Sequence, residues 1–234
     1  MKRIFFAIVS FLFVMSANAQ MNDRYTQFSV FDGVHYWAEA ACTYNSTSLK
    51  QADYKIGYRA GLGVDIPIFY SSVSFLPSAL FECKGYTENR RDQSGGKISR
   101  DVTSMYIEVP LEFSFNIKVG KRAGFQIAAG PYLAYGIGGK YTDTGETNLG
   151  LYGKETIELN TFKESSIDLG EEFDVKSALL KRFDLGVDLG VRFIFFRYFM
   201  VKVNAELGCI DMRADDSATA FRNRSFSAGL AFRY

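Results

Sequence analysis

Apolar and polar residues alternate strictly along two segments of the chain. In residues 107–117 every second residue is apolar, and Glu108 and Glu112 lie among the residues between them. Residues 183–195 repeat this alternation, with Asp184, Asp188 and Arg192 on the polar side. A helix would distribute these charges around its circumference, whereas a strand collects them on one side. Both segments are therefore predicted to be β-strands with one apolar and one polar face.

Weaker versions of the alternation extend the prediction to eight strands. They span residues 33–44, 54–66, 72–86, 104–118, 122–141, 180–195, 198–211 and 221–234. The connectors between them alternate between short and long. Outer-membrane barrels have an even number of antiparallel strands, short periplasmic turns and longer extracellular loops. The predicted fold class is therefore all-β: an eight-stranded antiparallel up-and-down transmembrane β-barrel of the outer membrane, with both termini periplasmic.

A soluble up-and-down barrel of the lipocalin type is the alternative, because it also has eight strands. Such a barrel keeps its apolar residues inside and its charges outside, and a membrane barrel reverses this. Long strands and small residues on the polar side favour the membrane barrel. So do aromatic residues predicted at the strand ends, which are Tyr58, Tyr106, Tyr135, Phe183, Phe195, Tyr198 and Phe199.

The beginning of the chain has the pattern of a secretory signal peptide. Lys2 and Arg3 precede an apolar run over residues 4–15, and Ala17 and Ala19 then stand before Gln20 as in an A-x-A cleavage site. An N-terminal membrane anchor is the alternative, but the run is short for a span of roughly 20 residues. The prediction is a cleaved signal peptide over residues 1–19, followed by one barrel domain over residues 20–234 with a long extracellular loop at 142–180.

Composition excludes several classes of function. The 27 Lys plus Arg residues against 26 Asp plus Glu leave no basic excess for nucleic-acid binding. Cys42, Cys83 and Cys209 fall on predicted strands that are not neighbours, so we expect free thiols facing the apolar side. No CxxC or Cys/His cluster indicates a metal site, and no cofactor is expected.

The polar side of the predicted strands carries charges of both signs. The interior of an eight-stranded barrel is only just wide enough for its own side chains, so these charges are expected to pair across it and fill it. The predicted structural network consists of Arg59, Glu82, Lys84, Glu108, Glu112, Asp184, Asp188, Arg192, Lys202 and Glu206, with Glu39 on the same side of the first strand.

No catalytic residues are predicted. Glu108 and Glu112 point the same way from one strand and stand about 13 Å apart, too far to act on one reacting bond. A barrel that hydrolyses lipid A would use a His at the outer rim, but the single histidine, His35, stands near the periplasmic start of the first strand. We expect His35, beside Trp37, to be an interfacial aromatic residue, and no G-x-S-x-G motif is present.

Two of the long connectors have opposite charge. Residues 142–180 contain nine acidic and three basic residues, but no D-x-[DN]-x-[DN]-G pattern of a calcium loop. A solvated extracellular loop with some hairpin structure at 157–162 is expected there. The second long loop carries Arg90, Arg91, Lys97 and Arg100, which are expected to contact anionic lipopolysaccharide or the acidic loop.

Several short motifs resemble one family of membrane barrels. They are Tyr106-Ile-Glu-Val-Pro-Leu-Glu-Phe113, Ala129-Gly-Pro-Tyr-Leu-Ala-Tyr135, Phe183-Asp-Leu-Gly-Val-Asp-Leu-Gly190 and the third-strand segment Phe75 to Gly85. In order and spacing they resemble the PorT-like family of outer-membrane β-barrel proteins, across all eight predicted strands. The final strand, with Phe226, Leu230, Phe232 and the terminal Tyr234, resembles the C-terminal signal that the barrel assembly machinery recognises.

This resemblance implies a fold and a location more firmly than an activity. The expected function is a monomeric, non-enzymatic outer-membrane barrel that binds through its loops or periplasmic rim, in contact with membrane lipid and lipopolysaccharide. An accessory role in a protein-secretion apparatus, with an envelope protein as partner, is one alternative, since the founding member of the family is associated with such an apparatus. A small solute pore and a lipid-modifying enzyme are the others.

Overall fold

A computed structural model of the chain consists of β-strands and their connections. It describes residues 30–48, 52–68, 72–91, 97–119, 121–145, 155–163, 179–213 and 220–234. The strands are β1 (His35–Thr47), β2 (Ala52–Ile68), β3 (Val73–Arg91), β4 (Lys97–Lys118), β5 (Gly124–Gly145), β6 (Glu155–Asn160), β7 (Phe183–Phe195), β8 (Phe199–Gly208) and β9 (Asn223–Arg233). No helix among these residues is long and apolar enough to cross a membrane.

Eight of the strands close into an antiparallel barrel. Each pairs with its neighbour in the chain, with β6 left out, and β1 pairs with β9 to close the ring. The sixth strand pairs only with the far end of β5, where Lys140 to Gly145 face Asn160 to Glu155. The prediction of an eight-stranded antiparallel barrel is confirmed, and the hairpin structure expected near 157–162 is the β5–β6 pair.

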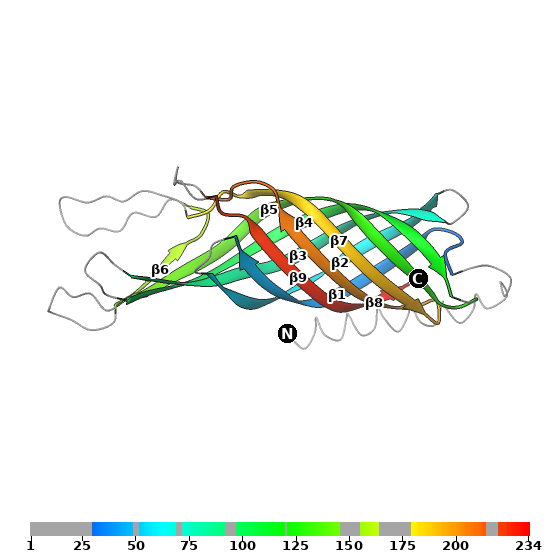
Figure 1. Ribbon diagram of the computed structural model, residues 1–234, viewed down its shortest axis with the longest axis horizontal. Coiled ribbons are helices and arrows are strands. Elements are labelled where there is room, and N and C mark those ends of the chain that lie inside the picture. Colours follow the sequence, from blue (N-terminus) through cyan, green and yellow to red (C-terminus); the bar gives the residue numbers. More distant parts are fainter. Residues whose placement is uncertain are drawn as a thin grey trace, which may run out of the picture.

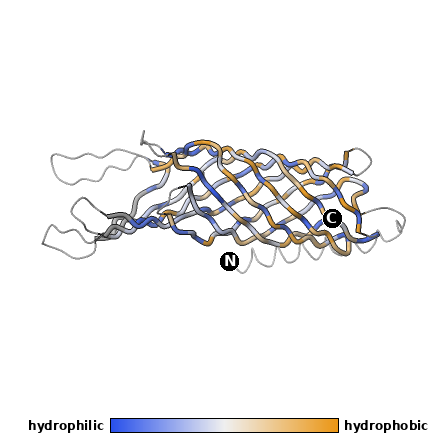
Figure 2. Tube along the Cα trace, in the orientation of Figure 1, coloured by the Kyte–Doolittle hydropathy of each residue, from blue (hydrophilic) through white to orange (hydrophobic). Residues whose placement is uncertain are grey.

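The apolar side of each strand faces outward. Leu62, Ile127 and Leu230 are exposed on the outer wall, whereas Glu82, Glu108 and Asp184 are completely buried inside. Figure 2 shows apolar positions recurring along every strand of the wall. This arrangement is that of a membrane barrel and the reverse of a lipocalin, because only a lipid environment favours an apolar exterior around a charged interior.

The two ends of the barrel differ. The strand ends that the short connectors after β2, β4 and β7 join lie at the same end as the C-terminus, on the right in Figure 1. The strands β3, β4 and β5 contain 19, 22 and 22 residues, and together with β6 they project at the opposite end. A strand needs only about 9 to 11 residues to cross a bilayer. We call the projecting part, residues 87–91, 97–101, 142–145 and 155–160, the extension.

Two side chains, Tyr106 and His35, lie elsewhere than predicted. Tyr106 is 1% exposed and lies inside the barrel, as does Trp37, which is 3% exposed. His35 Nδ1 lies 3.0 Å from Arg233 Nη2 and also belongs to the interior. The physical reason is strand alternation: Tyr106 shares its parity with Glu108, and His35 and Trp37 share theirs with Glu39.

All three cysteines are free. Cys42 and Cys83 occupy outward positions of β1 and β3, and Cys209 is exposed just after β8. The prediction of free thiols on the apolar side is therefore confirmed.

Candidate functional site

The interior of the barrel is filled by layers of side chains. At the short-turn end Val30 and Phe31, which precede β1, fold into the mouth, and both are almost completely buried. They pack with inward apolar residues from six strands, namely Trp37, Leu76, Ala128, Ile194, Met200 and Ala231. Arg233 holds this segment, because its Nη1 donates a 2.6 Å hydrogen bond to the carbonyl oxygen of Val30 and its Nη2 lies 2.9 Å from Asp65 Oδ2.

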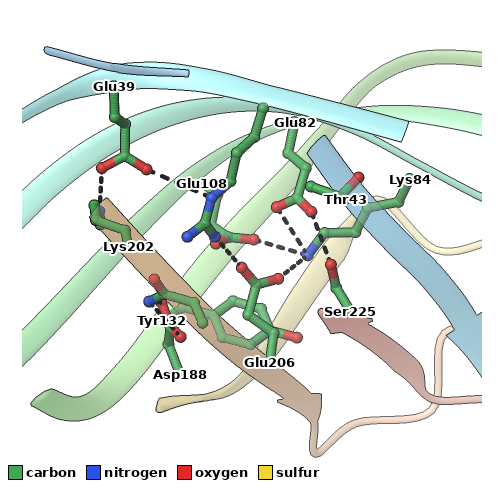
Figure 3. Close-up of polar contacts among 12 residues, drawn as sticks. Glu39, Thr43, Glu82, Lys84, Glu108, Tyr132, Asp188, Lys202, Glu206 and Ser225 are labelled. Atoms are coloured by element: carbon green, nitrogen blue, oxygen red, sulfur yellow. Dashed lines mark hydrogen bonds and ion pairs between the residues drawn. The ribbon is translucent and has the colours of Figure 1, made fainter. Parts of the chain in front are cut away.

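A hub of ion pairs occupies the middle of the barrel (Figure 3). Glu206, on β8, accepts hydrogen bonds from Arg59 Nη1 at 2.5 Å and from Lys84 Nζ at 2.7 Å. The ammonium of Lys84 also lies 2.9 Å from Glu108 and 3.5 Å from Glu82. These five residues come from β2, β3, β4 and β8, so the hub joins opposite walls across the interior.

A second group of charges surrounds the indole ring of Trp37. Lys202 pairs with Glu39, and Arg192 pairs with Glu112. Both cations also lie over the indole, with Lys202 Nζ 5.4 Å and Arg192 Cζ 5.5 Å from its ring centroid. The indole nitrogen of Trp37 donates a 2.9 Å hydrogen bond to Glu39. The indole ring thus contacts the cations of both ion pairs.

The remaining carboxylates of the network are held by neutral donors. Both oxygens of Asp188 accept from Asn204 Nδ2 at 3.0 Å. Asp184 Oδ2 accepts from Asn223 Nδ2 at 2.7 Å and from the hydroxyl of Tyr132 at 3.3 Å. The structure therefore places all ten residues of the predicted network inside the barrel. Arg59 Nε, 3.4 Å from Glu39 Oε1, joins the hub to the group around Trp37.

Some members of this interior were not predicted from the sequence. Among the described residues, nine acidic side chains are buried and five basic ones. The acids are Glu39, Asp65, Glu82, Glu88, Glu108, Glu112, Asp184, Asp188 and Glu206, and the bases are Arg59, Lys84, Arg192, Lys202 and Arg233. Asp65 points to the same side of β2 as Arg59, and Arg233 points to the same side of β9 as Ser225. Strand alternation in the sequence could therefore have identified both as inward residues.

Three of the carboxylates could in principle hold a cation. Oxygens of Glu82, Glu108 and Glu206 lie within 4.8 Å of one another. The ammonium of Lys84, however, is already in contact with all three, as an internal counter-ion. The Glu108 and Glu112 carboxylates belong to different ion pairs, with Lys84 and with Arg192, so they do not form an acid/base pair.

An apolar layer closes the interior at the long-loop end. It contains Tyr86, Val102, Tyr106, Tyr132, Ala134, Tyr141, Phe162, Leu180, Met212 and Phe221. Phe162, just after β6, packs edge-on against Tyr106 with ring centroids 5.5 Å apart. It also lies directly over Gly136, where a Cβ atom would come within 2.4 Å of its ring. This layer was not predicted from the sequence, because Phe162 and Leu180 stand in a connector without strand alternation.

The extension carries polar contacts in place of an apolar face. Lys55 Nζ pairs with Asp101 at 2.7 Å on the outside of the sheet, and Asn89 donates a 3.2 Å hydrogen bond to Asp53. The guanidinium of Arg100 lies 5.1 Å from the ring of Tyr141. Such side chains would be costly in lipid, so this part of the sheet belongs in water.

Other predicted features fall at the ends of the chain or in its connectors. Phe226, Leu230, Phe232 and Tyr234 lie along the outward side of the final strand, with Phe226 and Leu230 51% and 66% exposed. The predicted cleavage residues Ala17, Ala19 and Gln20 lie outside the described residues, as do residues 146–154 and 164–178 of the acidic connector.

Comparison with solved structures finds small outer-membrane barrels. Ail of Yersinia pestis, solved with the heparin analogue sucrose octasulfate, is 9% identical, with 86% of this chain and 99% of that chain covered and a TM-score of 0.38. Neisserial surface protein A is 10% identical, with 87% and 100% covered and a TM-score of 0.43. The N-terminal barrel domain of Pseudomonas aeruginosa OprF is 9% identical, with 84% and 97% covered and a TM-score of 0.28.

A search of curated proteins found no match to the sequence. A family model described as the outer membrane protein beta-barrel domain matches residues 18–212, which is most of the chain. The match includes every barrel strand except β9. The chain therefore belongs to the outer membrane protein beta-barrel domain family.

Proposed function

We propose that this outer-membrane barrel is a non-enzymatic binding protein that acts through its extension. The observation that carries the proposal is the length of β4 and β5, each 22 residues, about twice what a bilayer crossing needs. An ordered sheet outside the membrane is a surface for contact with another molecule, and function usually resides in segments that a rigid scaffold presents.

The filled interior argues against a solute pore. Apolar layers occupy both ends of the barrel, and ion pairs between opposite walls occupy its middle. His35 likewise argues against a lipid-modifying enzyme, since it faces inward at the short-turn end and contacts Arg233. A lipid substrate in the bilayer would have no access to an inward imidazole.

Within the family we place the chain in the PorT-like branch, on the resemblance of its strand motifs. One of these motifs, Tyr106-Ile-Glu-Val-Pro-Leu111, places its residues Tyr106 and Glu108 in the packed interior. An accessory role in protein secretion is the second candidate function. It would use the same extension or the short-turn rim to contact an envelope protein.

The proposed orientation has both termini and the short turns in the periplasm, following removal of residues 1–19 by signal peptidase. The alternation of short and long connectors supports this arrangement. We propose a monomer that is assembled by the barrel assembly machinery through its C-terminal aromatic residues.

Site-specific photo-cross-linking in whole cells tests the proposal. A photoreactive amino acid replaces Asp101, which is exposed on the extension, or, as a control, the exposed Lys121 on a short turn. Cross-linked species are purified in native detergent and identified by mass spectrometry. A single envelope component attached from position 101 and absent from position 121 is the expected result. Attachment from position 121 alone would contradict binding through the extension.

A further inference from the structure

Two arginines stand side by side on the outer wall at the long-loop end. Arg222 and Arg224 occupy consecutive outward positions on and just before β9, and both are exposed. Residues two apart on a strand point the same way and are separated by about 7 Å. Two guanidinium groups at that spacing can contact the oxygens of one phosphate or of two adjacent ones.

The arginines lie directly beyond an apolar and aromatic surface. Phe226, the next outward residue of β9, is 51% exposed, and Leu207 of β8 pairs with Arg224. On the other side Tyr44, which pairs with Phe226, stacks on Tyr54 with ring centroids 4.3 Å apart. Exposed Tyr and Phe rings at a strand end mark the membrane–water interface. Arg224 and Arg222 therefore stand one and two steps further out, at the depth of lipid headgroups.

Neither arginine has an anionic partner within the described part of the chain. The ion pairs found there use other residues, and no other interaction among the described residues involves either guanidinium. The described acid nearest in the chain, Asp211, accepts hydrogen bonds from the backbone N–H groups of Phe221 and Arg213. Within the described residues, no carboxylate neutralises the positive charge of the arginine pair.

The backbone that presents the pair is fixed. The N–H of Arg222 donates a 3.0 Å hydrogen bond to Ser48 Oγ, and its carbonyl oxygen accepts one of 2.9 Å from the N–H of Ser48. Arg224 continues the pairing opposite Ser46 of β1. Because the two Cα positions are held by the sheet, ligand binding needs to order only the side chains.

From this geometry we propose that Arg222 and Arg224 bind the phosphate groups of lipid A in the outer leaflet, with Tyr44, Tyr54 and Phe226 against its acyl chains. The inference rests on the proposed function in one respect, since it requires the long-loop end to face the cell exterior. Arginine is suited to this role because its planar fork matches phosphate oxygens. Anionic headgroups attract such a pair at the membrane surface, where the electrostatic attraction is only partly screened.

Binding of purified lipid A to the full chain in detergent micelles tests the proposal. Native mass spectrometry measures the fraction of protein that retains lipid, for the unaltered protein and for the double variant Arg222→Gln with Arg224→Gln. Retention is expected to fall by about tenfold or more in the variant. A matched control, Lys121→Gln with Arg122→Gln, removes two exposed charges at the opposite end and should retain lipid within about twofold of the unaltered protein.

Three lipids distinguish the source of the phosphate. Lipid A should be retained, whereas lipid A with its phosphates removed should not. Equal retention of phosphatidylglycerol would overturn the assignment to lipid A, and an unchanged arginine double variant would overturn the site itself. If the double variant fails to show the heat-dependent gel mobility of a folded barrel, the two single variants replace it. Micelles impose no orientation, so this result is independent of the cross-linking test of the extension.

Discussion

At the scale of single residues, the interior charges determine the register of the strands. Glu108 and Glu112 reach Lys84 and Arg192 only when β4 presents its even-numbered residues inward. A one-residue slip would turn both carboxylates into lipid and bring Ile107 and Val109 inside. The sequence predicted this set because alternation assigns a side to each residue. It did not predict which partners meet, since pairing depends on strand tilt and on the reach of each side chain.

Replacing one partner of an interior ion pair should lower the free energy of unfolding more than replacing both partners. Glu112→Leu leaves Arg192 as an uncompensated buried charge and should lower the free energy of unfolding by about 3 to 5 kcal/mol. Adding Arg192→Met should recover most of that loss. Urea unfolding in lipid vesicles, followed by fluorescence of the single tryptophan Trp37 beside Arg192, measures both. A double variant as unstable as the single one would contradict the predicted coupling.

Asp211 makes one connection at the long-loop end sensitive to acid. Hydrogen bonds from the backbone N–H groups of Phe221 and Arg213 lower the pKa of Asp211 below its usual value of 3.8. A lowered folded-state pKa means that the carboxylate stabilises the folded connection above about pH 4 and that this contribution is lost as the pH falls through the folded value. The protection of the Phe221 amide against hydrogen exchange, measured relative to its intrinsic rate at each pH, should therefore fall below about pH 4. In Asp211→Ala this pH-dependent loss of protection should be absent.

At the scale of elements, alternation predicted the membrane-spanning parts of the strands and missed their outer ends. The third, fourth and fifth strands were expected at 72–86, 104–118 and 122–141, whereas β3 continues to Arg91, β4 begins at Lys97 and β5 continues to Gly145. In the extension both faces of the strands are mostly polar. The sequence there does not alternate between apolar and polar residues, so it does not indicate a strand. The short turn after β7 was predicted from its length, but its conformation was not. Phe196 and Arg197 both have positive φ, at 51° and 69°, without a glycine.

The position of β6 and of the three residues after it should depend on one aromatic contact. Phe162→Ala removes the packing on Tyr106 and Gly136 that holds residues 155–163 over the barrel. Trypsin cleavage after Lys163 should become at least about tenfold faster, because a buried aromatic contact contributes well over 1 kcal/mol. Phe226→Ala, which removes an outward aromatic ring of the same size, serves as the control and should leave cleavage unchanged. An unaltered rate in Phe162→Ala would mean that other contacts hold the segment.

At the scale of the whole molecule, the chain combines a filled barrel with an ordered external sheet. Purified protein in a planar bilayer should therefore show no steady conductance, because the apolar layers and ion pairs leave no continuous path for water. A wide porin inserted under the same conditions verifies that the assay detects open channels. Stable openings of the unaltered protein would contradict a filled interior and favour the pore alternative.

The difference between the two ends predicts the orientation in the cell. With Cys42, Cys83 and Cys209 replaced by alanine, Lys163→Cys places a single thiol at the long-loop end and Lys121→Cys places one on a short turn; both positions are exposed. A membrane-impermeant maleimide should label position 163 on intact cells and position 121 only after the outer membrane is permeabilised. Long connectors lie outside in such barrels, and short turns face the periplasm. The opposite labelling pattern would show that the barrel is inserted in the reverse orientation. The extension and the arginine pair on β9 would then face the periplasm, away from the external medium and lipid A.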